Sequence, residues 1–344
     1  MKRESATIQV TDFYLWLKIM SKIKWASNLH VLSNSKEYTG PRWIFRGQAN
    51  AGWSIESSFE RKVLSQYAEK SKELEYTLRT KERLSIEYYR QHARGFVVPE
   101  ASNGDVLALM RHNGVPTRLV DFTEVPLVAL FFALEDENEK GDFAVWASVA
   151  DTSQNSYVIG AKKKVNPEVL MRTKGFCAYR KPQIELDYDM KSLLLWDESD
   201  RSQFEELLCD TRKEIEAPIL KYTPSVLNNR QRAQRGLFLS CTKLTSKFMP
   251  AYLAWIGVDS KSISEGQNKD RDLLQADGFI SEEFEEVKLL KFVFPAALRR
   301  IAKEFLDICN LNKQSLYDDL QGVSEYVASI LESKVHCVNA DRNV

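Results

Sequence analysis

Apolar positions recur at helical spacing near the start of the chain, and most later apolar positions form short unbroken runs. Residues 11–29, TDFYLWLKIMSKIKWASNL, predict an amphipathic helix with Thr11 or Asp12 as its N-cap. Residues 60–94 are laced with charge and predict a long helix with a solvated face. Residues 126–135 are apolar nearly all round, so we expect a buried helix there.

The remaining short runs predict strands separated by further helices. Strands are expected at residues 43–45, 117–121, 142–150 and 217–222, in GLFLSCT and in EVKLLKFVFP. Helices are expected from Asn103 through Met110, in SVLNNRQRAQ, in ALRRIAKEFLDIC after Pro295, and in the tail KQSLYDDLQGVSEYVASILE. Mixed elements with helices clustered at both ends indicate the α+β class.

Composition argues against several classes of protein. Lys and Arg (48) balance Asp and Glu (48), so no global charge attracts nucleic acid or a membrane. Five cysteines without a CxxC pair and four histidines without metal-binding spacing predict neither a disulfide framework nor a metal site, and they fit a reducing cytoplasm. We expect no signal peptide and no membrane span.

Charge is nevertheless uneven along the chain. Residues 217–258 contain no acidic residue and carry a charge of +6. The basic residues there are Lys221, Arg230, Arg232, Arg235, Lys243 and Lys247. Such an excess is typical of a local site for phosphate-bearing partners. Alternatively, these side chains pair with the acidic stretch at residues 185–216.

The first candidate motif is WIFRGQANAGW, where three large apolar residues precede Arg46 and Gly47. We expect a buried strand that ends there and projects Arg46. Arginine binds a phosphate or carboxylate through two parallel bonds, Gly47 allows a ligand close to the backbone, and Gln48 adds an amide. The alternative is a structural ion pair at Arg46 and a simple turn at Gly47.

The second motif, PTRLVDFT, brings Arg118, Asp121 and Thr123 to a strand end just before the buried helix. A strand that ends at a helix N-terminus creates a pocket suited to anions. Asp121 is alternatively an N-cap or a partner of Arg118. His112, shortly before, is a candidate acid or base, or a surface residue.

The third motif is NNRQRAQRGLF, in which Arg230, Gln234 and Gly236 precede a strand inside the basic segment. The alternative is an ordinary basic helix with a glycine C-cap.

Together, the Phe45-Arg46-Gly47 motif, the block HNGVPTRLVDFTEVPLVALFFAL and RQRAQRGLF resemble the FRG domain family over residues 40–240. The layout of that family is similar to ADP-ribosyltransferases, which implies an ADP-ribosyltransferase-like mixed β core. On this basis residues 1–40 are an N-terminal helical segment, residues 41–240 the FRG domain, and residues 241–344 a strand and helical extension of the same fold.

The resemblance also implies a binding site for NAD as substrate. Cleavage of the nicotinamide–ribose bond creates a cation at the anomeric carbon, so the enzyme needs a clamped diphosphate and electrostatic help. The implied cofactor-binding residues are Arg46, Gly47, Gln48, Thr117 and Arg118. The implied catalytic residues are Arg46, Asp121, Thr123 and Gln234, and the implied acceptor or nucleic-acid residues are Arg230, Arg232 and Arg235. At Gln234-Arg235-Gly236 the chain departs from the Gln/Glu-x-Glu pattern, because glycine has no carboxylate.

The expected function is that of an NAD-dependent mono-ADP-ribosyltransferase, acting as a toxin or antiphage effector. The basic segment favours RNA over protein as the acceptor, and an antitoxin is an implied partner. An NAD glycohydrolase and a non-enzymatic module that senses a nucleotide or nucleic acid are the alternatives.

Overall fold

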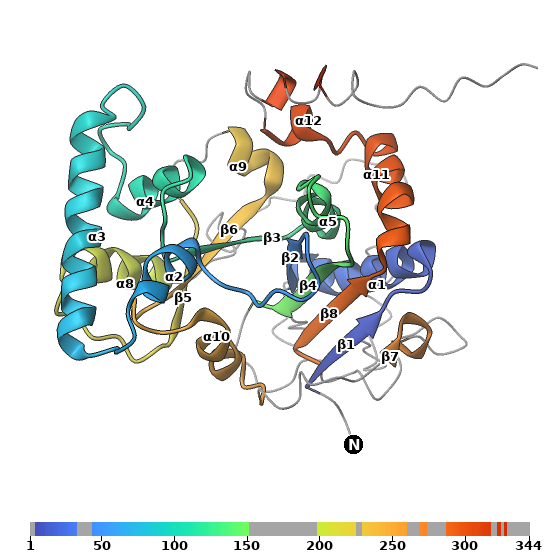
Figure 1. Cartoon of the computed structure of the whole chain (residues 1–344), viewed down its shortest axis with the longest axis horizontal. Helices are drawn as coiled ribbons and strands as arrows, with labels where there is room; N and C mark the ends of the chain where they lie inside the picture. Colours follow the sequence, from blue (N-terminus) through green and yellow to red (C-terminus); the bar gives the residue numbers. More distant parts are fainter. Residues whose placement is uncertain are drawn as a thin grey trace, which may run out of the picture.

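The computed structural model describes residues 4–32, 43–150, 198–224, 229–259, 268–273, 287–317, 322–324 and 327–328. The described strands form one eight-stranded sheet in the order β5-β6-β3-β2-β4-β8-β1-β7. Strand β1 pairs in parallel with β7 and β8, and the other neighbours are antiparallel. Helices surround this mixed sheet, so the α+β prediction is confirmed (Figure 1).

The elements are as follows. The strands are β1 (Ser5–Gln9), β2 (Trp43–Gln48), β3 (Leu119–Thr123), β4 (Phe143–Val149), β5 (Ile219–Tyr222), β6 (Gly236–Cys241), β7 (Asn268–Lys269) and β8 (Leu289–Phe294). The main helices are α1 (Phe13–Leu32), α2 (Ser58–Lys62), α3 (Lys72–His92), α4 (Asn103–His112), α5 (Pro126–Leu134), α8 (Glu198–Cys209), α9 (Asn229–Gln234), α10 (Phe248–Ile256), α11 (Arg299–Ile308) and α12 (Lys313–Tyr317).

One face of the sheet is covered by two separate groups of helices. Helix α5 packs on β2 and β4, whereas α4 and α8 pack over β3, β6 and β5 around a second apolar cluster. Figure 1 shows α3 and α4 at one side of the molecule and α11 at the other, with α5 between them. Since strand side chains alternate between faces, Phe45, Gly47, Asp121 and Thr123 all point to this face.

The opposite face of the same strands packs against α10. The rings of Phe122 and Phe248 lie 6.5 Å apart, and those of Phe122 and Tyr252 lie 5.9 Å apart. All three belong to the larger apolar cluster, which also contains the fully buried Trp43 and Phe45. Burial on both faces explains why this part of the sheet has long apolar runs in sequence.

The N-terminal helix α1 follows strand β1, which was not predicted from the sequence. Asp12 Oδ1 accepts the main-chain N–H groups of Tyr14 (2.8 Å) and Leu15 (3.2 Å), which confirms Asp12 as the N-cap. Before it, β1 pairs along its whole length with β8, near the other end of the chain. The buried carboxylate of Asp270 accepts the N–H groups of Thr11 (2.8 Å) and Asp12 (2.9 Å) and fixes the junction.

Two of the predicted helices differ in their bounds. Residues 60–94 are not one helix: α2 ends at Lys62, and α3 begins after Ser71, whose hydroxyl accepts the N–H of Leu74 at 3.1 Å. The N-cap of α4 is Ser102, not Asn103, because Ser102 and Asp105 form a reciprocal capping box. The buried helix at residues 126–135 is confirmed as α5, with Pro126 in its first turn.

Strand β2 does not end at Arg46. It runs through Gln48 because each of its six residues pairs with β4, and the chain turns only afterwards. The last part of the predicted helical tail, from residue 329, lies outside the described residues. Residues 185–197 of the acidic stretch also lie outside them.

Candidate functional site

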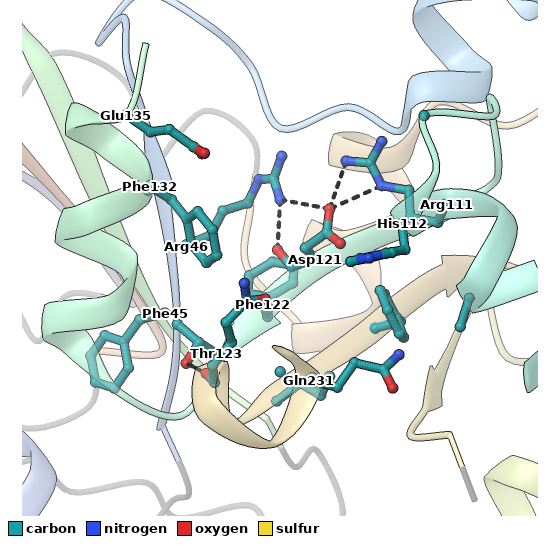
Figure 2. Close-up of a pocket in the computed structure, with 17 residues that line it drawn as sticks. Phe45, Arg46, Arg111, His112, Asp121, Phe122, Thr123, Phe132, Glu135 and Gln231 are labelled. Atoms are coloured by element: carbon teal, nitrogen blue, oxygen red, sulfur yellow. Dashed lines mark hydrogen bonds and ion pairs between the residues drawn. The ribbon is translucent and has the colours of Figure 1, made fainter. Parts of the chain in front are cut away.

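A cavity of about 320 Å³ lies over the junction of β2 and β3, between α4 and α5. Strand residues that include Phe45, Asp121 and Phe238 line its floor. Arg111 and His112 line it from the end of α4, Phe132 and Glu135 from the end of α5, and Gln231 and Gln234 from α9. Figure 2 shows the side chains of Arg46, Arg111 and Asp121 directed toward one another.

The cavity exists because β2 and β3 diverge. They pair at Phe45 and Thr123 only, whereas β2 pairs with β4 along all six residues. Arg46 follows the paired residue and reaches into this gap: its Nη1 donates to the main-chain oxygen of Asp121 at 2.6 Å. The guanidinium thus occupies the place where backbone hydrogen bonds would otherwise join the two strands.

Asp121 lies between two arginines (Figure 2). Arg111 donates to Asp121 Oδ2 from both Nε (3.1 Å) and Nη2 (2.6 Å), and Arg46 Nη1 lies 3.9 Å from the same oxygen. The three side chains form what we call the arginine–aspartate cluster. It joins the end of α4 to β3 and to β2.

The electrostatics of the cluster follow from burial and proximity. Burial acts to raise the pKa of Asp121, but Arg111 and Arg46 together outweigh it and hold that pKa below its usual value. Asp121 in turn raises the pKa of Arg111. Burial lowers the pKa of Arg46 to about 10, partly opposed by Asp121, so the group remains charged at neutral pH.

Arg46 uses only one of its three nitrogens within the described part of the chain. Nη1 makes both contacts to Asp121, while Nε is buried without a hydrogen-bond partner. A buried unsatisfied donor costs about 1–3 kcal/mol, more for a charged group. Nε and Nη2 form the side-on fork through which arginine binds carboxylates and phosphates. The strand arrangement therefore fixes Arg46 by one arm and leaves its fork unbonded.

Thr123 and Gln234 connect β3 to α9 at the rim. The Thr123 hydroxyl donates to Gln234 O at 2.7 Å and accepts the N–H of Val125 at 3.1 Å, just before α5 begins. The Gln234 amide donates to Leu316 O at 3.1 Å and so ties α9 to α12. Both residues line the cavity, as predicted from their motifs, but their polar groups also hold the surrounding elements together.

Three predicted site residues lie elsewhere. Arg118 is 2 % exposed, lies just before β3 begins, and binds Glu82 and the main-chain oxygens of Cys241 and Thr242. Thr117 is buried, and its main chain bonds to Ser58. Gln48 accepts Trp146 Nε1 at 2.6 Å and donates to Ser54 O at 2.9 Å, so its amide is occupied. None of the three lines the cavity, and we correct their assignment as ligand contacts.

Gly47 lines the cavity, but packing explains why it is glycine. A Cβ there would collide with the main-chain oxygen of Ala129 and come within 2.6 Å of the Ala133 nitrogen. The absent side chain lets α5 lie directly on β2. Clearance for a ligand was the predicted role, whereas clearance for a helix is what the structure contains.

The predicted acceptor residues lie on or next to α9. Arg232 is in this helix and Arg235 directly follows it with a φ of 45°, and neither lines the cavity. The side chain of Arg230 lies outside the described residues. Gly236 lines the cavity at the start of β6.

Several cavity residues were not predicted from the sequence. Arg111 and Glu135 are the charged ones, and Phe132 and Gln231 are among the others. The position of Glu135 directly after a wholly apolar helix is the one sequence signal that marks it. No group of three metal-binding side chains occurs among the described residues, and none of the described helices has the length and apolarity to cross a membrane.

The fold and cavity define an α+β protein with a partly charged, partly aromatic pocket at a divergence between central strands, a setting typical of small-ligand sites. Residues 41–142 match the family model of the FRG domain, so the chain carries an FRG domain. The match includes Arg46, Arg111, Asp121 and Glu135, and it is shorter than the predicted range of residues 40–240. No curated protein and no solved structure matches the chain.

Proposed function

We propose that the cavity binds NAD⁺ and that the protein is an NAD-dependent mono-ADP-ribosyltransferase. The observation that carries the proposal is the state of Arg46: one nitrogen is held by Asp121, and the side-on fork is unbonded beside a ligand-sized cavity. Such a fork matches the two oxygens of one phosphate. Arg46 therefore takes the diphosphate, and Asp121 sets its orientation.

The shape of the cavity supports a partial burial of the dinucleotide. Its volume of about 320 Å³ lies at the lower end of the range of about 300–1,000 Å³ usual for ligand pockets. A cavity of this size takes one end of NAD⁺ and leaves the other end across the rim. The nicotinamide ring, which is planar and cationic, suits the Phe132 and Phe238 side chains in the cavity wall.

The acceptor would approach past α9. Gln231 and Gln234 line the cavity from this helix, and Arg232 and Arg235 belong to the segment with a charge of +6. A phosphate-rich acceptor, with RNA ahead of protein, fits this charge. Modification of RNA would make the protein a toxin or antiphage effector, with a neutralising antitoxin as a partner in the cytoplasm.

The test is incubation of the full chain with NAD⁺ labelled in the adenine-bearing half, with and without total RNA or protein extract. We expect nicotinamide release and label covalently attached to the acceptor, abolished above a few hundred millimolar salt if RNA is the acceptor. Free ADP-ribose as the sole product would instead make the protein an NAD glycohydrolase. Saturable NAD⁺ binding with no nicotinamide released would leave only the sensing module.

A further inference from the structure

The helices that line the cavity differ in how they are held. Helices α4 and α5 carry buried apolar side chains into the two larger clusters of the core. Helix α9, which contributes Gln231 and Gln234, is six residues long and has the sequence NRQRAQ, with Ala233 as its one apolar residue. Within the described part of α9 no side chain is buried, and none belongs to an apolar cluster. A helix so short and so polar has little stability of its own.

Polar contacts at its C-terminal end hold α9 against the rest of the fold. The Thr123 hydroxyl donates to Gln234 O at 2.7 Å, and the main-chain N–H of Glu124 donates to Arg235 O at 3.2 Å. The Gln234 amide donates to Leu316 O in α12 at 3.1 Å. Each such hydrogen bond contributes little net stability, because water replaces it when the helix moves away. Of the helices that line the cavity, α9 is therefore the one that opens most readily.

Helix α12 fastens α9 from the outside. It packs against α9, but its own anchor is apolar: Leu316 and Tyr317 are buried in the larger core cluster. The Tyr317 ring lies 6.0 Å from the ring of Phe131 in α5. Figure 1 shows α12 between α9 and α11, on the same side of the molecule as α5. Helix α12 thus connects the weakly held wall, α9, to the firmly held wall, α5.

The chain conformation directly after α9 marks the point about which the helix turns. Arg235 has a φ of 45°, in the left-handed region that is unfavourable for a residue with a Cβ. Gly236, the next residue, is fixed in β6 by its pairing with Thr123. An unfavourable backbone conformation persists where surrounding contacts enforce it, and such positions cluster at ligand clamps and switches. Release of Gln234 lets Arg235 relax, so this junction favours the open arrangement.

We propose that α9 is a gate to the cavity and that α12 is the strap that holds it closed. When the bond from Gln234 to Leu316 O breaks, α9 turns about Arg235 and uncovers the side of the cavity that Gln231 and Gln234 line. Neither helix lies within residues 41–142, so the strap places access to the cavity under the control of the C-terminal part of the chain. The gate acts on any ligand of the cavity, and it rests on the proposed function only where NAD⁺ serves as the probe.

Hydrogen exchange followed by mass spectrometry tests the gate without a ligand. Gln234→Met removes the amide donor at nearly constant size. We expect the main-chain amides of α9 to exchange about 3- to 10-fold faster, the change that corresponds to one hydrogen bond. Leu316→Ala weakens the anchor of the strap and should speed exchange of the same amides by at least about 10-fold.

Each variant has a matched control away from the strap. Gln66→Met also removes an amide donor to a main-chain oxygen, that of Lys62 at the end of α2. Leu64→Ala truncates a leucine as buried as Leu316, in the separate cluster that contains Leu78. Both controls should leave exchange in α9 at the wild-type rate, even where Leu64→Ala lowers global stability as much as Leu316→Ala does.

Binding kinetics test whether the gate controls entry. The probe is a fluorescent, adenine-modified NAD⁺ in stopped-flow mixing, and the variant is Leu316→Ala, because Leu316 does not line the cavity. The association and dissociation rates should both rise by about 10-fold, since the ligand enters and leaves through the same opening. The Kd should change by less than about twofold while the closed arrangement still predominates. A purely structural role for Leu316 would not move the two rates together.

Faster exchange in α9 together with faster entry and exit of the probe would support the gate. Unchanged exchange in α9 in both variants would overturn it for every ligand. Faster exchange with unchanged association and dissociation rates would mean that ligands enter by another route, so the gate would be wrong while NAD⁺ binding stood. If the wild type binds no NAD⁺, the proposed function fails, and hydrogen exchange alone decides whether α12 holds α9 closed.

Discussion

Two arginine clusters each include one residue of the motif PTRLVDFT, Arg118 in one and Asp121 in the other, and they differ in how completely the arginine nitrogens are bonded. In the buried cluster, Arg118 Nε and Nη2 bind Glu82 at 2.9 Å and 2.5 Å, and Nη1 binds the main-chain oxygens of Cys241 and Thr242. In the arginine–aspartate cluster, Arg46 uses only Nη1. Both arginines are largely enclosed, with side-chain exposures of 2 % and 14 %.

The difference indicates which cluster is structural. Arg79 repeats the pattern of Arg118: its three nitrogens bind Glu75, Lys213 O and Thr242 O. Together these side chains fasten α3 to the ends of β3 and β6. A buried arginine with every nitrogen bonded has nothing left for a ligand. Arg46, with an unbonded fork beside a cavity, is the one suited to binding.

The largest expected effect is a loss of stability when the buried cluster of Arg118 and Glu82 is disrupted. Arg118→Met should lower the free energy of unfolding by about 3–5 kcal/mol, because it leaves the buried Glu82 carboxylate without its partner. Urea denaturation followed by circular dichroism measures it. The control is Arg83→Met on α3, the helix that carries Glu82. The Arg83–Glu87 pair is exposed and should contribute less than about 1 kcal/mol. Equal midpoints for the two variants would remove the structural role assigned to Arg118.

The second effect is a loss of ligand affinity when the arginine–aspartate cluster is changed. Arg46→Met should weaken NAD⁺ binding by about 10- to 100-fold, the loss of one charge-assisted contact, and change unfolding by less than about 1 kcal/mol because Nε is unsatisfied in the native state. Titration calorimetry and urea denaturation on the same protein give both numbers. Arg61→Met is the control: Arg61 is exposed but acts electrostatically on Arg46. If Arg46→Met lost as much stability as Arg118→Met and bound NAD⁺ with unchanged affinity, Arg46 would be a structural residue and not a ligand-binding one.

Local patterns predicted the elements well and the contacts between them poorly. The apolar run of α5 and the strands β4, β6 and β8 depend on neighbouring residues, and the sequence indicates them directly. Strand β1 has the sequence SATIQ, which is too short and too polar to predict alone. It forms because β8 offers a partner from the other end of the chain.

The candidate site shows the same limit. Arg46 and Asp121 were predicted as site residues from separate motifs, and the structure brings them together at the divergence of β2 and β3. Arg118 was predicted with them, but it lies just before β3 begins, where Glu82 and the main-chain oxygens of Cys241 and Thr242 bind it. Arg111 was missed because its partner, Asp121, lies on another element. A pattern of residue types does not show which arginines have their nitrogens bonded within the folded protein.

The smallest effect is a pH dependence at Asp121. Its pKa in the folded protein lies below the usual value, so its ionised form stabilises the fold above the unfolded pKa, about 4. That contribution is lost as the pH falls through the folded pKa. Because the Asp121 side chain is 42 % exposed, screening limits it to at most about 1 kcal/mol.

Asp121→Asn should therefore be slightly less stable than wild type at pH 7. The difference should begin to shrink below pH of about 4 and should vanish only once the pH is below the lowered pKa of the folded protein, where both side chains are neutral. Urea denaturation at a series of pH values measures it. Glu87→Gln, at an exposed helix pair, is the control for a carboxylate with little coupling. A difference that stayed constant down to the acid limit would mean that the Asn side chain alters packing. The arginines would then not depend on the charge of Asp121 for their arrangement.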